Sequence, residues 1–135
     1  MVKKLLKPKR APRGQKMIVD KIKANIPPMT IIPKPKAKSD FIVKGWGKRR
    51  EENALIYKIP NNKNPKRPYE KGITESEWTL AYNQLKKTGD FTRDWFNENL
   101  PACANEGSCN FTTIGGIFEK LELAKYTSDG IYKKI

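Results

Sequence analysis

Positive charge is concentrated in the first part of this 135-residue chain. Residues 1–50 hold 16 basic and 2 acidic side chains, a balance of +14 that equals the formal net charge of the whole chain. Residues 51–72 carry +2 and residues 73–135 carry −2. Because like charges repel one another and stay solvated, this asymmetry separates a basic leader from a part that can pack a core. A strongly basic leader also favours a polyanionic partner.

Prolines oppose packing of the leader as well. It holds six of the ten prolines of the chain, and residues 34–38 read KPKAK, where fixed φ angles add to the charge repulsion. We therefore predict that residues 1–38 are a flexible, extended basic arm. Its predicted contacts with backbone phosphates are Lys7, Lys9, Arg10 and Arg13. The apolar residues of MIVDKIKANI have rough helical spacing and are expected to fold on a partner. A merely solubilising tail is the alternative.

Residues 39–72 are interpreted as a β-hairpin followed by a linking loop. The apolar runs FIVKGWG and ALIYKIP flank the polar tip KRREEN, and Pro60 ends the second strand because proline has no N–H to donate. The segment NNKNPKRPYEKG that follows is rich in turn formers. The cations predicted to hold phosphates in this hairpin are Lys44, Lys48, Arg49 and Arg50. Trp46 lies beside them between two glycines, and it either stacks on a base or sugar or belongs to the core.

Helix signals begin at Thr74. Thr74 and Glu77 form a capping box, and Gly89 supplies a left-handed stop. Between them apolar residues recur at helical spacing, namely Trp78, Ala81, Tyr82 and Leu85. Two more helices are predicted over residues 90–100 and 110–121, with the loop ACANEGSC between them. The three helices are expected to share one core.

The chain ends in a hairpin pattern. Residues 123–126 and 131–135 are predicted strands, and Asp129 and Gly130 supply the positive φ angles of a tight turn. Three helices and then a hairpin are the order of a winged helix. Residues 74–135, which end in FTTIGGIFEKLELAKYTSDGIYKKI, therefore resemble a winged helix-turn-helix nucleic-acid-binding domain. In that family a last helix leads through an LxLA step into a glycine-tipped wing.

The resemblance implies roles for individual residues. The helix over residues 111–121 would be the recognition helix, with groove or phosphate contacts from Thr112, Thr113 and Lys120. The contacts of the wing with the backbone would come from Lys125, Lys133 and Lys134. This helix has no arginine, so the bidentate contact that commonly reads guanine is missing. Sequence-specific reading by this helix is therefore not expected.

Two pairs of residues leave alternatives open. Gly115 and Gly116 lie inside the third predicted helix, where glycine is unfavourable. They indicate close packing against the second helix or close approach of a phosphate or partner. Cys103 and Cys109 are interpreted as two ordinary thiols, and a small disulfide loop is the alternative.

The residue types present argue against catalysis. The chain has no histidine, which removes the commonest general base, and neither GxxxxGK[ST] nor GxGxxG occurs. Two cysteines cannot complete a four-ligand zinc site. Asp90 with Asp94, and Glu51 with Glu52, are carboxylate pairs of the kind that bind magnesium, but helix-start acidity and solvent exposure explain them. We predict no metal, no cofactor and no enzymatic activity.

These patterns together predict an α+β protein with a basic arm (residues 1–38), a β-hairpin with its loop (39–72) and a small winged-helix domain (73–135). The predicted function is that of a non-catalytic DNA-binding accessory protein that grips the phosphate backbone. The alternative is a protein-interaction winged-helix module within a larger DNA or RNA nucleoprotein assembly. DNA is expected more than RNA.

No membrane partner is expected, because no apolar run approaches about 18 residues. The start of the chain lacks the apolar stretch of a secretory signal. We therefore expect a cytoplasmic, intracellular protein, with a nucleoid or virus-associated location also open.

Overall fold

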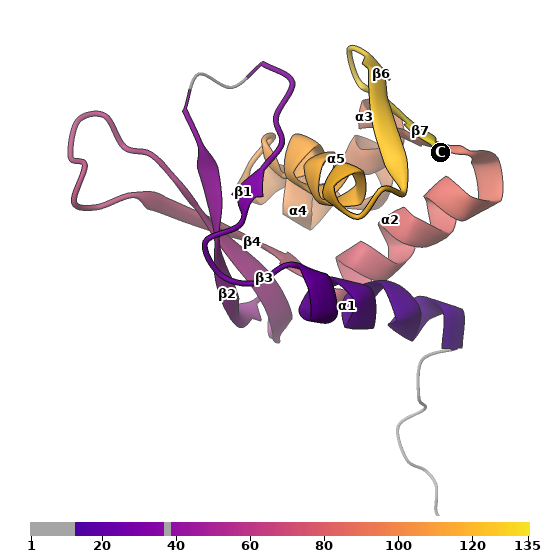
Figure 1. The fold of residues 1–135 in the computed structure, drawn as a ribbon, viewed down its shortest axis with the longest axis horizontal. Coiled ribbons are helices and arrows are strands. Elements are labelled where there is room, and N and C mark those ends of the chain that lie inside the picture. Colours follow the sequence, from indigo (N-terminus) through magenta and orange to yellow (C-terminus); the bar gives the residue numbers. More distant parts are fainter. Residues whose placement is uncertain (1–12, 37–38) are drawn as a thin grey trace, which may run out of the picture.

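The computed structural model describes residues 13–36 and 39–135, with side chains from Met17 onward. Within this part the protein is a mixed α+β structure with five helices and two antiparallel sheets (Figure 1). The elements in chain order are α1 (Arg13–Asn25), β1 (Ile31–Ile32), β2 (Phe41–Arg49), β3 (Glu52–Ile59), β4 (Tyr69–Thr74), α2 (Glu75–Thr88), β5 (Asp90–Thr92), α3 (Arg93–Asn99), α4 (Pro101–Glu106), α5 (Asn110–Lys120), β6 (Ala124–Ser128) and β7 (Ile131–Lys134).

The first sheet has the strand order β1-β2-β3-β4. The predicted hairpin is confirmed as β2 and β3, and β3 ends just before Pro60. Residues 61–72 are not merely a linking loop, because Tyr69–Thr74 pairs along β3 as the strand β4. The connection over residues 60–68, here called the finger, projects away from the sheet (Figure 1).

The C-terminal part follows the predicted order closely. The capping box of Thr74 and Glu77 is present, and Gly89 ends α2 with a φ of 82°. Gly130 has a φ of 76° in the turn of the last hairpin. One prediction is wrong, because residues 101–106 of the expected loop form the short helix α4, which proline can begin without losing a hydrogen bond. The strand β5 adds to the hairpin, giving a second sheet of order β5-β7-β6.

The predicted arm is wrong for residues 13–36, which belong to the body of the protein. Helix α1 buries Ile18, Val19 and Ile22, and the residue that follows it, Ile26, is buried too, in the same hydrophobic cluster that contains residues of α2, α5 and both sheets. Burial of each such side chain stabilises by about 1.5 to 3 kcal/mol, which outweighs the repulsion between exposed lysines on the opposite face. The described residues of the predicted arm, of the hairpin segment (39–72) and of the C-terminal segment (73–135) therefore contribute to one core. Lys7, Lys9 and Arg10 lie outside the described residues.

Helix α5 lies between the two sheets (Figure 1), and its paired glycines make this possible. A Cβ on Gly115 would lie 2.2 Å from ring atoms of Tyr132, and a Cβ on Gly116 would lie 2.2 Å from the carbonyl oxygen of Pro33. The expectation of close packing at these glycines is thus correct in kind, but the partners are β7 and the segment after β1 rather than the second helix.

Two further observations concern the described residues alone. None of the helices in the described part of the chain combines the length and the hydrophobicity that are needed to cross a membrane. No cluster of three or more Cys, Asp or Glu side chains in this part of the chain has the arrangement of a metal site.

Candidate nucleic-acid interface

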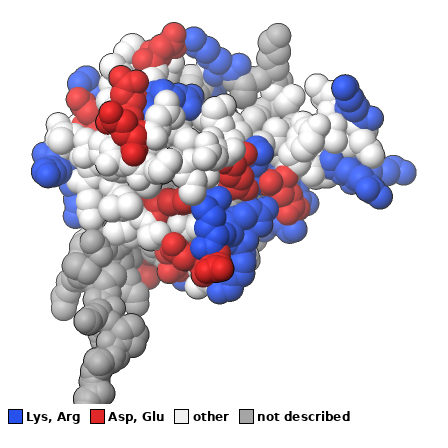
Figure 2. Space-filling view, turned by 180° about the vertical axis from the view of Figure 1, so that it is seen from behind, with Lys and Arg blue, Asp and Glu red and all other residues white. Residues whose placement is uncertain are grey.

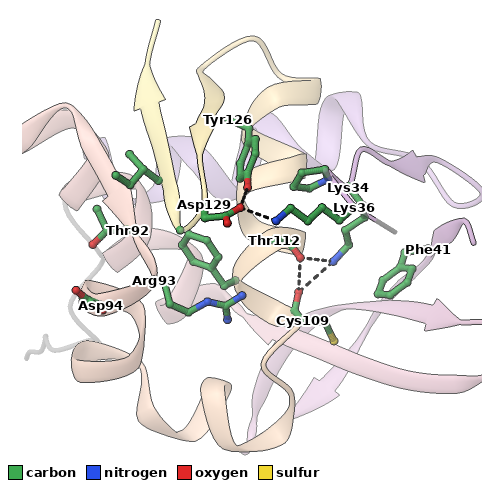
Figure 3. A pocket seen from close by; sticks show the side chains of 14 residues that line it. Lys34, Lys36, Phe41, Thr92, Arg93, Asp94, Cys109, Thr112, Tyr126 and Asp129 are labelled. Atoms are coloured by element: carbon green, nitrogen blue, oxygen red, sulfur yellow. Dashed lines mark hydrogen bonds and ion pairs between the residues drawn. The ribbon is translucent and has the colours of Figure 1, made fainter. Parts of the chain in front are cut away.

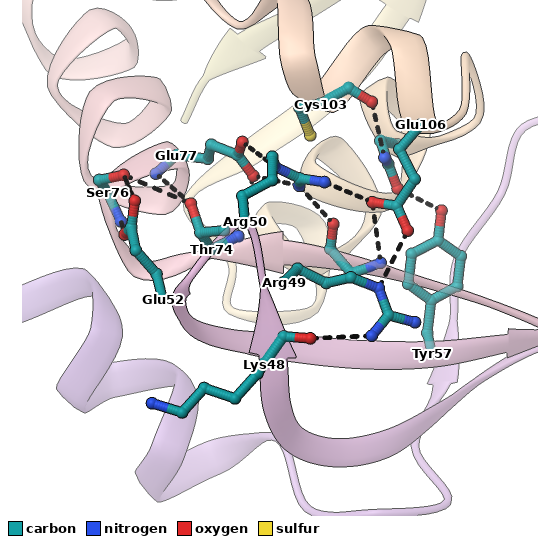
Figure 4. A network of polar contacts seen from close by, with 12 residues as sticks. Lys48, Arg49, Arg50, Glu52, Tyr57, Thr74, Ser76, Glu77, Cys103 and Glu106 are labelled. Atoms are coloured by element: carbon teal, nitrogen blue, oxygen red, sulfur yellow. Dashed lines mark hydrogen bonds and ion pairs between the residues drawn. The ribbon is translucent and has the colours of Figure 1, made fainter.

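Arg50 lies in an ion cluster that holds the tip of the first hairpin (Figure 4). Its guanidinium donates two hydrogen bonds to Glu77 at 2.8 and 2.7 Å, one to Glu106 at 2.7 Å and one to the carbonyl oxygen of Gly72 at 2.9 Å. Arg50 and Glu51 form the turn with φ angles of 50° and 65°, in the region that favours glycine. The cluster therefore fixes an unfavourable turn, and Arg50, predicted as a phosphate contact, is engaged by acceptors within the protein.

The pKa values in this cluster agree with tight pairing. The hydrogen bonds that Arg50 donates to Glu77 raise the pKa of Arg50, although burial acts in the opposite direction. Burial tends to raise the pKa of Glu77, but the hydrogen bonds from Arg50 and from the backbone N–H of Thr74 outweigh it and lower that pKa. Both groups are therefore charged at neutral pH and stabilise each other.

The other predicted cations of the hairpin differ in their surroundings. Arg49 donates to Glu106 at 3.1 Å, and exposed Lys44 donates to Glu70 at 2.9 Å. Lys48 is exposed, points away from the ion cluster (Figure 4) and has no ion pair in the described part of the chain. Trp46 is half-buried against the core, with the Lys23 ammonium 5.0 Å from its ring centroid. It is thus a residue of the core margin rather than an open stacking platform.

The helix that the resemblance designates for recognition, α5, is mostly enclosed. Eight of its eleven residues are buried, and Thr113 is 0% exposed, so its predicted contact with nucleic acid is wrong. Lys34 covers the start of this helix, since its ammonium donates to Thr112 at 2.9 Å, to Thr113 at 2.7 Å and to the carbonyl oxygen of Cys109 at 3.0 Å. Of the predicted contacts on α5, only Lys120 is exposed.

Lys34 is itself an unusual cation. Burial lowers its pKa to about 7, and the neighbouring charge of Arg93 acts in the same direction. Its ammonium also lies 4.2 Å from the ring centroid of Phe41. All three of its N–H groups have acceptors, so Lys34 fastens the segment after β1 to α5 and has no donor left for a ligand.

The lysines of the C-terminal hairpin are exposed. Lys133 donates to Asp90 at 2.8 Å, which links β7 to β5 and gives Asp90 a structural role. Lys125 and Lys134 form no ion pair among the described residues. Of the other carboxylates once considered for magnesium, Glu52 accepts hydrogen bonds from the hydroxyl and backbone N–H of Ser76.

The finger carries three further cations. Lys63, Lys66 and Arg67 are exposed, and none forms an ion pair within the described residues. Figure 2 shows Lys and Arg at the tip of this projection without adjacent Asp or Glu, whereas acidic and basic side chains alternate over the middle of the same face. The finger therefore presents positive charge that the protein does not neutralise.

Local hydrogen bonds order the finger. The Asn61 side chain accepts from the backbone N–H groups of Lys63 and Asn64 and donates to the carbonyl oxygen of Arg67. Three prolines in residues 60–68 restrict the backbone further. Tyr69, 54% exposed, stands at the base where β4 begins. Turn formers dominate this segment and indicate an ordinary loop, although the run KNPKR is a visible signal of positive charge.

Comparison of this chain with protein-family models, with curated proteins and with solved structures finds no match.

Proposed function

We propose that this protein is a non-catalytic nucleic-acid-binding protein that grips the phosphate backbone mainly through the finger. The observation that carries the proposal is the ordered, projecting group of Lys63, Lys66 and Arg67 without carboxylate partners. Cations that are held out to solvent on a restrained backbone can bind phosphates without losing internal ion pairs or much conformational entropy. The exposed ring of Tyr69 lies where an unpaired base can stack.

The twelve residues that precede α1 supply further charge. They contain five Lys and Arg and no acidic residue. Such a segment adds sequence-independent affinity for a polyanion. We therefore propose that residues 1–12 serve as the basic arm, which is shorter than the arm over residues 1–38 expected from the sequence.

We further propose that residues 74–135 form a winged-helix domain that serves as a scaffold rather than a base reader. The helices α2, α3 and α5, with the short helix α4 between the last two, precede a hairpin that β5 extends into one small sheet, and this order supports the fold assignment. The burial of α5 opposes insertion of this helix into a groove. The same burial favours the second candidate, a protein-interaction module within a nucleoprotein assembly, in which the finger holds nucleic acid and other surfaces hold the partner.

The test is a binding assay with the full chain, because the C-terminal part shares its core with α1 and the first sheet. A finger variant carries Lys63→Gln, Lys66→Gln and Arg67→Gln. A control variant loses three exposed lysines elsewhere through Lys23→Gln, Lys86→Gln and Lys87→Gln. Each protein is titrated against duplex DNA, single-stranded DNA and single-stranded RNA.

The finger variant is expected to bind at least about tenfold more weakly at low salt, since each lost phosphate contact removes released counterions. The control variant should stay within about twofold of the unmodified protein, because its charge change is equal but its position is not. Equal affinities for the finger variant and the unmodified protein would refute the proposal. Duplex DNA is expected to bind best, and a Tyr69→Ala variant should weaken only the single strands.

A further inference from the structure

A cleft of about 750 Å³ lies between the segment after β1, the start of α5 and the turn of the last hairpin. Its size is in the range of pockets that hold a small organic ligand. Figure 3 shows Arg93 reaching into it from one side and Lys34 and Lys36 from the other. Arg93 and the neighbouring pair Lys34 and Lys36 thus line one concave surface that the proposed function does not use.

Arg93 is positioned to bind an anion. One of its guanidinium nitrogens donates to the carbonyl oxygen of Ser108 at 2.6 Å, and its central carbon lies 4.5 Å from the ring centroid of Phe111. These contacts fix the plane of the group, while its other N–H groups form no hydrogen bond within the described residues. A fixed guanidinium with free donors matches the oxygens of a phosphate.

Lys36 provides a second, exchangeable cation. It lies 2.7 Å from Asp129, which also accepts a hydrogen bond from the hydroxyl of Tyr126 at 2.7 Å. The side chains of Lys36 and Asp129 are 72% and 79% exposed, so this ion pair is worth little in water. The free-energy cost of moving the Lys36 ammonium from Asp129 to a bound phosphate is therefore small. Lys34 has no N–H donor left and contributes only its charge.

Aromatic and acidic groups complete the lining. Phe41 is half-buried at the edge of the cleft and stacks on Tyr57, with 6.1 Å between the ring centroids. The Lys34 ammonium lies over this ring, so the part of the ring that it leaves uncovered is the apolar contact offered to a base. Asp94 and Asp129 also line the cleft, and Asp94 has no ion-pair partner among the described residues. Two carboxylates disfavour a ligand with several phosphates and tolerate one with a single phosphate.

We propose that this cleft binds a nucleotide unit with one phosphate monoester, the phosphate on Arg93 and Lys36 and the base against Phe41. The ligand is either a free nucleoside monophosphate or the phosphorylated end of a strand. The finger is close enough in the fold to connect the two sites for a strand, because β2 begins at Phe41 and Ile42 pairs with Lys58 near the base of the finger. The cleft does not need the finger for binding.

The test uses the full chain labelled with ¹⁵N and titrated with adenosine 5′-monophosphate, adenosine or inorganic phosphate. Adenosine monophosphate is expected to shift amide signals of residues that line the cleft, and adenosine should bind far more weakly. Arg93→Gln should weaken the affinity for adenosine monophosphate by about tenfold or more, because a charge-assisted hydrogen bond is lost. Lys36→Gln should weaken it by a smaller factor, and Lys87→Gln should leave it unchanged.

The side chain of Lys36 is exposed, so Lys36→Gln should not destabilise the fold. This variant therefore decides the test if Arg93→Gln proves unstable. The proposal would be overturned if millimolar adenosine monophosphate shifted no amide signals of the residues that line the cleft and Lys36→Gln left the affinity for this nucleotide unchanged. A finger variant that still binds the nucleotide separates this site from the proposed function. Oligonucleotides with and without a 5′-phosphate distinguish the two sources. If the ligand is the phosphorylated end of a strand, the 5′-phosphorylated oligonucleotide should bind the cleft more tightly than adenosine monophosphate does.

Discussion

Two basic runs of the first sheet, residues 48–50 and residues 63–67, resemble each other in composition and differ in what surrounds them. At the tip between β2 and β3, Arg49 and Arg50 are paired with Glu77 and Glu106 from two helices. At the finger between β3 and β4, the three cations form no ion pair with a carboxylate of the described residues. Basic side chains of the same types therefore stabilise the fold in one run and remain accessible to an external anion in the other.

The difference teaches that the role of a cation depends on the acidic residues that the topology brings to it. Glu77 and Glu106 are 27 and 56 residues away from Arg50 in the sequence. A count of basic residues along the chain cannot separate these roles, and substitutions at the two runs can.

The largest expected effect on stability comes from Arg50→Ala. The substitution leaves Glu77 and Glu106 half-buried without their main partner, so the free energy of unfolding should fall by about 3 kcal/mol. Denaturant unfolding measures this change. The neighbouring variant Lys48→Ala should change stability by less than about 0.5 kcal/mol, because Lys48 has no ion pair in the described structure. Equal stabilities of the two variants would mean that the ion cluster does not hold the turn.

A second prediction concerns the internal cation Lys34. Its pKa is lowered to about 7 in the folded protein and keeps its ordinary value of 10.5 when unfolded. Above pH 7 the unfolded chain holds a proton that the folded chain has released, so the free energy of unfolding should rise with pH. Between pH 7 and 9 the rise is about 2 kcal/mol. The chain has no histidine to mask the effect.

Unfolding curves at several pH values measure this rise. In Lys34→Met it should vanish, whereas Lys36→Met should retain it, because hydrogen bonding to Asp129 raises the pKa of Lys36 rather than lowering it. A rise that persists in Lys34→Met would assign the pH dependence to another group.

The smallest expected effect on stability is that of the finger variant. Lys63, Lys66 and Arg67 make no internal ion pairs in the described structure, so their replacement by glutamine should change the free energy of unfolding by less than about 0.5 kcal/mol. Thermal unfolding beside the unmodified protein checks this. A loss above about 1 kcal/mol would show that the finger cations serve the fold as Arg50 does.

Local signals in the sequence predict much of the fold. The capping box at Thr74, the stop at Gly89 and the turn at Gly130 depend on neighbouring residues, and all three are present. The strand β4 and the docking of α1 were not predicted because both depend on distant partners. Tyr69–Thr74 becomes a strand by pairing with β3, and the apolar face of α1 meets core residues far along the chain.

The candidate interface was predicted less well than the fold. The sequence indicates that the first half of the chain is basic, but it cannot show that Lys34 and Arg50 face acceptors inside the protein. Burial of Thr113 follows from packing of the segment after β1 on α5, which no local pattern indicates. The finger was missed because its asparagines and prolines are equally typical of an ordinary connection.

The most direct test of the central claim is the salt dependence of binding to duplex DNA for the finger variant and for the control variant. The logarithm of the binding constant falls by about 0.9 per logarithm of salt for each phosphate contact, so the loss of three contacts should make the slope of the finger variant shallower by about 2 to 3. The control variant, with the same loss of charge, should keep the slope of the unmodified protein. Identical slopes for all three proteins would contradict the claim that the finger holds the phosphate backbone.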